Sequence, residues 1–387
     1  MKNFAFLLAF FASVAATQDI KPPSVDAAGA VLIDMDSGRV LWEKDKDKEL
    51  AMASTTKIMT AILAIEQGNL DDVVVVSKRA AAAPKVNMSL QAGEEIPLKA
   101  LLYAIMLQSS NDAAVAIAEH ISGDVEVFCK MMTTKAHALG ATNTYFATPS
   151  GLDGDMHHST AHDMAIIAQY ALQNPTFVSI INTPSYHATS NKRSHDISNK
   201  NRLLNEYDGA FGVKTGFTNK AGHCFVGAAE RGDLNLISVV FASGWGAKGK
   251  ERKWIDTKNL LNYGFDNFEM VEVIGEGQPA GHIAVVRSRT PQLDLAYSHT
   301  LTLPLIKSSE DVKITPQIPT QIQAPINADT QIGYAQIHIN GQHFADVPIH
   351  TTTPATRHDL KTSLEKVLKT FFSLGADEEI TITLPEF

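Results

Sequence analysis

The chain has 387 residues, a formal net charge of -9 and a hydrophobic content of 44%, which is that of an ordinary globular protein. This length allows two domains and a large core, whereas the acidic balance and the lack of a basic cluster argue against nucleic acid as the main partner. The 14 histidines show no metal-ligand spacing, so we expect no metal ion and no other cofactor.

The first residues follow the pattern of a secretory leader. Lys2 precedes an apolar stretch over residues 4–14, which is too short to span a bilayer and is followed by two alanines. We therefore expect residues 1–16 to be a signal peptide and the mature chain to be exported. Cys129 and Cys224 lie in apolar stretches, so one disulfide and two buried thiols both stay open.

Apolar periodicity predicts an α+β domain over residues 26–268. A hairpin is expected over residues 30–43, followed by a core helix that begins near Ser54 and ends at Gly68. Further helices are predicted at residues 98–106, 112–118, 125–139 and 161–172. A polar loop over residues 182–201 should lead to three strands and a closing helix, at residues 211–215, 224–229, 234–242 and 252–263. This order favours a mainly antiparallel sheet faced by helices.

From about residue 270 the sequence changes to short alternating runs separated by proline, glycine and asparagine. Asn340-Gly341 suits a two-residue hairpin turn, so we expect a small all-β domain over residues 270–350. Residues 356–374 predict an amphipathic helix, and an acidic tail follows over residues 375–387. This helix is a candidate membrane anchor, and packing on the β domain is the other interpretation.

Ser54 and Lys57 form a Ser-x-x-Lys pair at the start of the first core helix. Their spacing puts the hydroxyl and the amine on one helix face. Near a helix start, unpaired N–H groups and the helix dipole favour the negative charge that develops when a serine attacks a carbonyl. The pair alone is weak evidence, because Ser363 and Lys366 repeat it in the C-terminal helix. Alone, it would indicate a capping serine and a solvated lysine.

Two further motifs change this interpretation. Ser109-Ser110-Asn111 falls in a predicted break between helices, and Lys214-Thr215-Gly216 ends a predicted strand. Each motif occurs once in the chain. Their order and spacing after Ser54 fit the Ser-x-x-Lys, Ser-x-Asn and Lys-Thr-Gly set of penicillin-recognising serine enzymes.

With these motifs the sequence resembles the serine-type D-alanyl-D-alanine carboxypeptidases of peptidase family S11, among the low-molecular-weight penicillin-binding proteins. Gly151-Leu152-Asp153, the stretch 161–165 and the stretch 214–222 are also similar to that family. The resemblance covers about residues 28–350. It implies a transpeptidase-like domain, in which an antiparallel sheet lies between helices, followed by a C-terminal β domain.

The resemblance implies a role for each motif residue. Ser54 attacks the penultimate D-alanine to form an acyl-enzyme, and Lys57 is its base if burial and a second cation lower the lysine pKa. Ser109 passes a proton to the leaving amine, and Asn111 holds Lys57 and the substrate amide. Lys214 and Thr215 bind the terminal carboxylate, and the N–H groups of Ser54 and Phe217 bind the oxyanion. Gly216, between Thr215 and Phe217, is a further substrate-binding residue. Lys200 and either Arg252 or Lys253 are further candidates, although solvated surface charges are favoured there.

We therefore expect the removal of D-alanine from peptidoglycan stem pentapeptides in the periplasm, a role in cell wall biogenesis and cell shape, and covalent inhibition by β-lactams. A helix on the membrane would place the enzyme on the outer face of the inner membrane. A DD-endopeptidase that cleaves peptide cross-links remains an alternative. A class A β-lactamase is disfavoured because no glutamate lies between Glu126 and Glu206 to activate water. A non-catalytic wall-binding protein is disfavoured by the intact motifs.

Overall fold

A computed structural model describes residues 20–306, 309–357, 364–365 and 367–370. The predicted signal peptide and the acidic tail lie outside these residues. So does most of the predicted C-terminal helix, of which residues 364–365 and 367–370 are helical. Within the described ranges, no helix is both long enough and apolar enough to cross a membrane. Contacts divide the chain into two compact units, the second of which comprises Val271–Leu303 and Ser308–Phe387.

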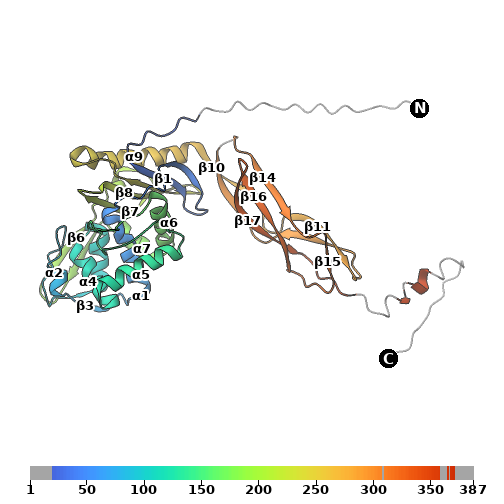
Figure 1. Cartoon of the computed structure of the whole chain (residues 1–387), viewed down its shortest axis with the longest axis horizontal. Coiled ribbons are helices and arrows are strands. Elements are labelled where there is room, and N and C mark those ends of the chain that lie inside the picture. Colours follow the sequence, from blue (N-terminus) through green and yellow to red (C-terminus); the bar gives the residue numbers. More distant parts are fainter. Residues whose placement is uncertain (1–19, 307–308, 358–363, 366, 371–387) are drawn as a thin grey trace. The chain divides into compact units, whose positions relative to one another are not determined.

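A five-stranded antiparallel sheet forms the centre of the first unit, with the strand order β2-β1-β9-β8-β7 (Figure 1). The strands are β1 (Gly29–Asp34), β2 (Val40–Lys44), β7 (Ala210–Thr218), β8 (Gly222–Arg231) and β9 (Leu234–Phe241). This order brings the first hairpin of the chain beside its later strands and leaves β7 at one edge of the sheet.

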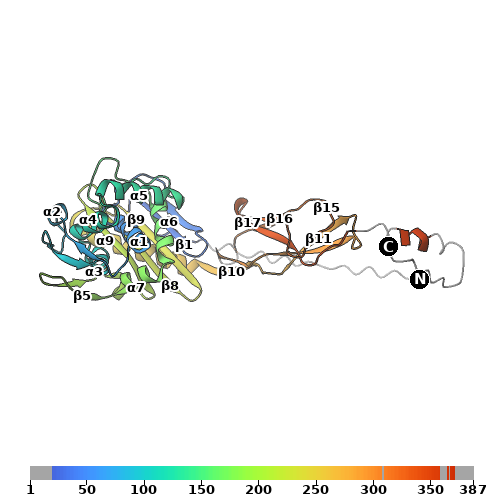
Figure 2. The same cartoon turned by 90° about the horizontal axis from the view of Figure 1, so that it is seen from below.

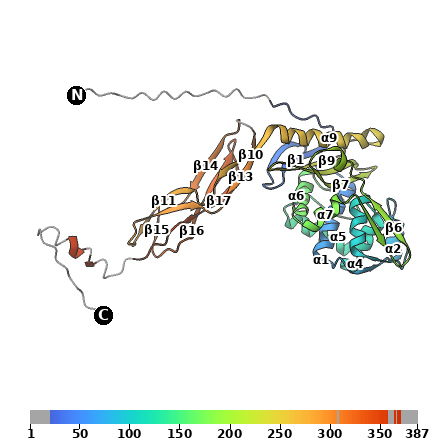
Figure 3. The same ribbon diagram turned by 180° about the vertical axis from the view of Figure 1, so that it is seen from behind.

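Both faces of this sheet are buried, which explains the continuous apolar runs in its strands. Along β1, Ala30 and Leu32 belong to one apolar cluster, and Val31 and Ile33 belong to the other. The long helix α9 (Gly246–Asn267) covers the first face, and α6 packs on the opposite one (Figures 1 and 3). The predicted fold class, an antiparallel sheet between helices, is confirmed.

Helix α1 (Lys57–Gln67) lies among α4, α5, α6 and α7 (Figure 2). The short turn η1 (Ala53–Thr56) precedes it, and residues 57–64 are all buried, as expected for a core helix. The other helical segments are α2 (Lys78–Ala81), α3 (Leu98–Tyr103), the π-helix η2 (Ala104–Gln108), α4 (Asn111–Ser122), α5 (Val125–Ala138), α6 (Ala161–Leu172), α7 (Pro175–Asn182) and α8 (Leu203–Glu206).

The prediction of a polar loop over residues 182–201 is wrong. Strands β5 (Ser185–Thr189) and β6 (Ser194–Ser198) form an antiparallel hairpin there. Its side chains are mostly polar, and contacts with distant parts of the chain hold it. The Tyr186 ring stacks on Tyr103 with ring centroids 3.8 Å apart, and His195 lies 2.7 Å from the Glu94 carboxylate. Such contacts leave no local signal in the sequence.

The structure also adds a helix, extends another and shows the state of the two cysteines. Helix α7 was not predicted, although Asn174 caps its first turn and Pro175 follows, which is a regular helix start. Helix α9 is longer at both ends than the predicted 252–263. Cys129 and Cys224 are free and buried, and burial raises the pKa of both thiols to about 12.

The second unit contains a six-stranded sheet of order β14-β16-β17-β12-β11-β15, whose strands run side by side in Figure 3. They are β11 (Pro279–Val286), β12 (Gln292–Tyr297), β14 (Val312–Gln317), β15 (Gln321–Gln323), β16 (Gln331–Ile339) and β17 (Gln342–Thr351). The predicted turn is present, because Asn340 and Gly341 have φ values of 51° and 79°. Two further pairs are β10 (Phe268–Ile274) with β13 (Leu301–Ile306) and β3 (Val73–Val75) with β4 (Glu95–Pro97).

Candidate active site

Ser54 lies in the 3-10 turn η1, immediately before α1 rather than inside the helix. The preceding residue, Ala53, has a φ of 48°, which residues with a Cβ atom rarely adopt. A Cβ atom on Gly151 would lie 2.0 Å from the Ala53 carbonyl oxygen, and one on Gly216 would lie 3.1 Å from the Ser54 nitrogen. The loop at Gly151 and strand β7 therefore both pack closely against the backbone at Ser54, because glycine has no Cβ atom at these two positions.

Lys57 is fully buried, and its amine joins three separate parts of the chain. The Nζ atom donates hydrogen bonds to Ser54 Oγ at 3.0 Å, to Asn111 Oδ1 at 2.8 Å and to the carbonyl oxygen of Ser150. Ser54 Oγ also lies 3.4 Å from the Ser150 carbonyl oxygen. The first two motifs thus meet at Lys57.

The surroundings of Lys57 favour its neutral form. Burial lowers its pKa well below the usual value for lysine, and the charge of Lys214 lowers it further, while Asp112 acts in the opposite direction. The Asp112 carboxylate accepts hydrogen bonds from the N–H groups of Met88 and Leu90, at 3.1 and 2.9 Å. A neutral amine 3.0 Å from a serine hydroxyl can take its proton.

Lys214 extends from β7 and is only 1% exposed. Its Nζ atom donates to the Thr215 carbonyl oxygen at 3.0 Å. Burial lowers the pKa of Lys214 to about 7, and the charge of Lys253 acts in the same direction. The third motif therefore places a buried cation close enough to Lys57 to lower the pKa of that lysine.

The interpretation of Lys253 as a solvated surface charge is wrong. Helix α9 packs on β8 and β9, which buries Lys253, and burial lowers its pKa to about 8. Arg252, the neighbouring residue, instead pairs with Asp26 and is partly exposed. Lys200 is exposed, as the sequence favoured. Lys253 thus belongs to the site electrostatically, through Lys214.

The second motif lies where the π-helix η2 ends. Ser109 has a φ of 71°, and α4 begins at Asn111. The Ser109 hydroxyl is buried and has no hydrogen-bond partner in the part of the chain that the structure describes. Asn111 Nδ2 donates to the Pro84 carbonyl oxygen at 3.0 Å, which orients Oδ1 towards Lys57. A buried hydroxyl of this kind needs a partner, and a substrate amine can supply one.

The third motif runs along the free edge of the sheet. In the register of β7 with β8, Gly216 is opposite Cys224 and Phe217 is opposite His223. An edge strand has backbone groups on one side that are not used by the sheet, and these can bind an extended peptide. Thr215, Gly216 and Phe217 therefore follow Lys214 along a surface that suits a peptide substrate.

The sequence did not indicate two residues, His157 and Thr56, that hold the Ser54 turn through hydrogen bonds. The Ala147 N–H donates to His157 Nδ1 at 3.0 Å, so the ring proton is assigned to Nε2, which donates to Thr56 Oγ1 at 3.0 Å. Thr56 Oγ1 donates in turn to the Ala53 carbonyl oxygen at 2.8 Å. Burial lowers the pKa of His157 to about 4, which keeps the ring neutral near pH 7. The only signal for this region was the Gly151-Leu152-Asp153 stretch.

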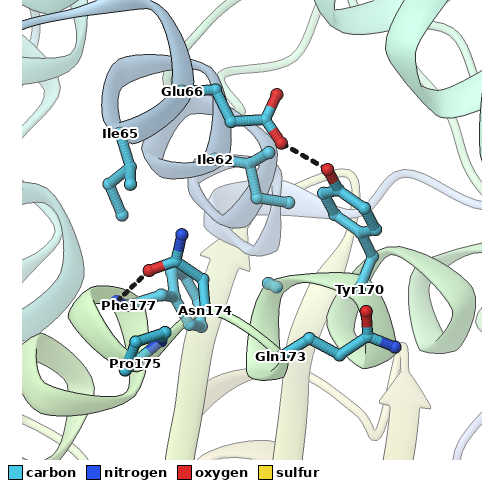
Figure 4. Close-up of a pocket in the computed structure, with 9 residues that line it drawn as sticks. Ile62, Ile65, Glu66, Tyr170, Gln173, Asn174, Pro175 and Phe177 are labelled. Carbon is cyan, nitrogen blue, oxygen red and sulfur yellow. Dashed lines mark hydrogen bonds between the residues drawn. The ribbon is translucent and has the colours of Figure 1, made fainter.

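A separate pocket of about 200 Å³ lies towards the other end of α1 (Figure 4). Its walls include Ile62 and Ile65 of α1 and Phe177 of α7, and the Tyr170 hydroxyl donates to the Glu66 carboxylate beside it. None of the motif residues lines this pocket. The candidate active site is therefore the region where Ser54 and the three motifs meet.

Two family models match the chain. The model for D-alanyl-D-alanine carboxypeptidase matches residues 16–244, and the model for the C-terminal domain of penicillin-binding protein 5 matches residues 268–356. The chain belongs to the D-alanyl-D-alanine carboxypeptidase family. This result confirms the resemblance that the three motifs indicated, and it makes the chain a member of a family of serine peptidases.

Individual relatives match both units. The D-alanyl-D-alanine carboxypeptidase DacF of Bacillus subtilis is 35% identical over 367 residues, which is 92% of this chain and 92% of that protein. DacC of Escherichia coli is 33% identical over 384 residues, which covers 89% of this chain and 88% of that protein. The crystal structure of penicillin binding protein 5 from Haemophilus influenzae has a TM-score of 0.73, 30% identity and coverage of 87% of this chain and 100% of its own.

Proposed function

We propose that this family member removes the terminal D-alanine from peptidoglycan stem pentapeptides through an acyl-enzyme on Ser54, and so acts in cell wall biogenesis and cell shape. The observation that carries the proposal is the 3.0 Å contact between Lys57 Nζ and Ser54 Oγ. It lies in a buried site where desolvation and Lys214 lower the pKa of Lys57. The carboxypeptidase names of the relatives support the same substrate.

In the first step, neutral Lys57 takes the Ser54 proton, and Oγ attacks the carbonyl carbon of the penultimate D-alanine. The N–H groups of Ser54 and Phe217 stabilise the oxyanion. Ser109 then donates a proton to the nitrogen of the terminal D-alanine, the C–N bond breaks, and Ser109 regains a proton from Lys57. Water next attacks the acyl-enzyme with Lys57 again as base, which releases the shortened peptide and restores Ser54.

Lys214 and Thr215 bind the terminal carboxylate in this scheme. Because the pKa of Lys214 is lowered to about 7, an arriving carboxylate is the group that holds its proton in place. The Asn111 side chain already contacts Lys57 and Pro84, and its amide retains one N–H and one acceptor site for the substrate amide. A β-lactam would enter the same site and acylate Ser54.

We also propose export to the periplasm and attachment to the outer face of the inner membrane through residues 356–374. The carboxypeptidase family model begins at residue 16, where the predicted leader ends. Leu364 and Val367 of the predicted amphipathic helix are 51% and 65% exposed. The predicted leader is tested by determining the N-terminal residue of the cell-associated protein, which should lie just after residue 16. Unchanged membrane partition after deletion of residues 356–387 would contradict the attachment.

The activity is tested with a stem pentapeptide that ends in D-Ala-D-Ala and a measurement of free D-alanine. Ser54→Ala should abolish release, and Ser363→Ala, in the second Ser-x-x-Lys copy, is the matched control that should not. No release by the unaltered protein, or equal release by Ser54→Ala, would overturn the proposal. A cross-linked dimer assayed in parallel separates carboxypeptidase from endopeptidase activity, and release of hydrolysed penicillin at each turnover would indicate a β-lactamase.

A further inference from the structure

Asp112 is a buried carboxylate to which the proposed reaction gives no role. It lies in the first turn of α4, directly after Asn111, and is fully buried. Its oxygens accept hydrogen bonds from three backbone N–H groups, those of Met88 at 3.1 Å, Leu90 at 2.9 Å and Ala113 at 2.9 Å. An ionised carboxylate only accepts hydrogen bonds, so three donors at a helix start suit its charged form. Asp112 therefore places a negative charge beside the second motif.

This charge acts on the base of the reaction. No basic side chain pairs with Asp112 in the ranges that the structure describes, and a buried charge without a partner costs free energy. Asp112 is linked to Lys57 through its neighbour, because the Lys57 amine donates to Asn111 Oδ1 at 2.8 Å. The charge of Asp112 raises the pKa of Lys57, against the stronger effects of burial and of Lys214. A buried charge that acts on a catalytic amine indicates a function.

The reaction changes the charge of Lys57. Lys214 of β7 brings a positive charge to its surroundings, and Asp112 of α4 brings a negative one. His157, in the loop behind, is neutral near pH 7. When Lys57 takes the Ser54 proton, a second ammonium group forms in the same buried site as Lys214. Like charges repel strongly where water is excluded, and a nearby opposite charge offsets this repulsion. The charge of Asp112 is therefore needed most when Lys57 is protonated.

We propose that Asp112 is a positioning residue whose buried negative charge holds the proton on Lys57 after its removal from Ser54 and until its transfer to Ser109. This inference rests on the proposed function, in which Lys57 carries that proton between the two serines. Among the hydrogen bonds of the described residues, none joins Asp112 to Lys57 directly. A carboxylate paired with the amine would keep it protonated and remove the base. From its place behind Asn111, the charge supports the ammonium and still allows Lys57 to lose the proton.

Asp112 also has a purely structural effect, which a test has to separate from the effect of its charge. Its hydrogen bonds hold the loop over residues 84–90. In that loop the carbonyl oxygens of Pro84 and Val86 accept hydrogen bonds from Asn111, at 3.0 and 2.7 Å. Loss of this loop geometry would slow acylation by a similar factor at every pH. Loss of the charge would instead change the pH at which the base becomes neutral, so a pH profile distinguishes the two effects.

The test is the rate of Ser54 acylation by a fluorescent penicillin as a function of pH, because the acidic limb of this profile reports the pKa of Lys57 in the free enzyme. Asp112→Asn removes a charge that raises this pKa, so the limb should move to lower pH, by about one unit. The rate above the limb should fall by up to about tenfold, because Lys57 becomes a weaker base. Asp112→Ser, a smaller neutral variant, should move the limb equally, and Asp112→Glu should leave it near its original position.

Asp163 provides a matched control elsewhere in the first unit. It is buried in the first turn of α6 and accepts hydrogen bonds from the Asn143 N–H and the Thr144 hydroxyl, both at 2.7 Å. Asp163→Asn disturbs a comparable set of buried hydrogen bonds, so it should lower the melting temperature as Asp112→Asn does. It should leave the acidic limb in place.

A limb that stays in place in Asp112→Asn or in Asp112→Ser would overturn the proposal, because the loop alone would then explain any slower acylation. The same shift in Asp163→Asn would also overturn it, since a general loosening of the first unit would then move the limb. Failure of the proposed function gives a different result. In that case the unaltered protein would release no D-alanine from the stem pentapeptide at any pH.

Discussion

The two units of this chain use their interiors differently. The second unit buries apolar side chains such as Ile337 and Ile349 and keeps polar pairs such as His282 with Asp294 exposed. The first unit instead buries three lysines close enough to influence one another's pKa, which are Lys57, Lys214 and Lys253. Burial of a charge costs free energy. The second unit avoids this cost by keeping such pairs exposed, whereas the first unit bears it at its three lysines.

Positive φ values at residues other than glycine occur in both units, and two of those in the first unit lie at the candidate site. In the second unit, the positive φ values of Asn340 and Gly341 lie in a hairpin turn that requires them. In the first unit, Ala53 and Ser109 have positive φ values beside the nucleophile and at the second motif. The comparison shows that buried charges and strained backbone conformations indicate a catalytic site when several of them lie close together.

Replacement of the buried base should have the largest effect. Lys57→Met should lower the rate of Ser54 acylation by a fluorescent penicillin by roughly 10²–10⁴-fold, because no amine remains to take the proton. The melting temperature should change by no more than about 5 °C, since relief from burying the amine offsets the lost hydrogen bonds. Acylation that persists at the original rate would contradict Lys57 as the base.

A core deletion in the second unit should have the opposite profile. Ile337→Ala should lower the unfolding free energy of that unit by about 2–5 kcal/mol, because Ile337 is fully buried. The rate of Ser54 acylation should stay the same, because the site lies in the first unit. Calorimetry and acylation kinetics measure the two effects, and Tyr334→Ala, at a 38% exposed position, is the control. A parallel loss of acylation would show that the units do not act independently.

The hydrogen bonds behind Ser54 should have an intermediate effect. Thr56→Val keeps the shape of the side chain but leaves the His157 N–H and the Ala53 carbonyl without their partner. Acylation of Ser54 should slow by about tenfold, because two buried hydrogen bonds that hold the Ser54 turn are lost, and Thr56→Ser should restore it. If Thr56→Ser is as slow as Thr56→Val, packing rather than hydrogen bonding holds the turn.

The smallest effect should be a shift in pH dependence. Lys214 must be charged to bind the carboxylate, and burial together with the Lys253 charge lowers its pKa to about 7, so kcat/KM falls as the pH rises through that value. Lys253→Gln removes one positive charge, which raises the pKa of Lys214 and moves the alkaline limb of the profile to higher pH. Arg252→Gln, at the neighbouring surface position, should leave the limb in place. A limb that does not move in Lys253→Gln would contradict this coupling.

Local patterns predicted most of the first unit. The opening hairpin, the helices around Ser109 and the three late strands follow from apolar periodicity and turn residues, which depend on neighbours in the chain. The β5–β6 hairpin could not be predicted in this way, because Tyr186 stacks on Tyr103 and His195 pairs with Glu94. The partners of these residues lie far away in sequence.

In the candidate site, too, local patterns predicted some residues and long-range packing decided others. The motif spacing indicated Ser54 and Lys57, but it could not choose between Arg252 and Lys253. Adjacent residues on a helix point about 100° apart, so only the packing of α9 decides which one is buried. His157 and His158 are likewise adjacent, and only the contact with Thr56 distinguishes His157.

By itself, the sequence determined which reactive groups the chain carries, in what order, and on which kinds of element they lie. Only the tertiary structure decided that the buried Lys57 amine meets Ser54, Asn111 and Ser150. The physical reason is that the pKa of an amine depends on its desolvation and on the charges within a few ångströms of it. Those distances join atoms from residues that are remote along the chain.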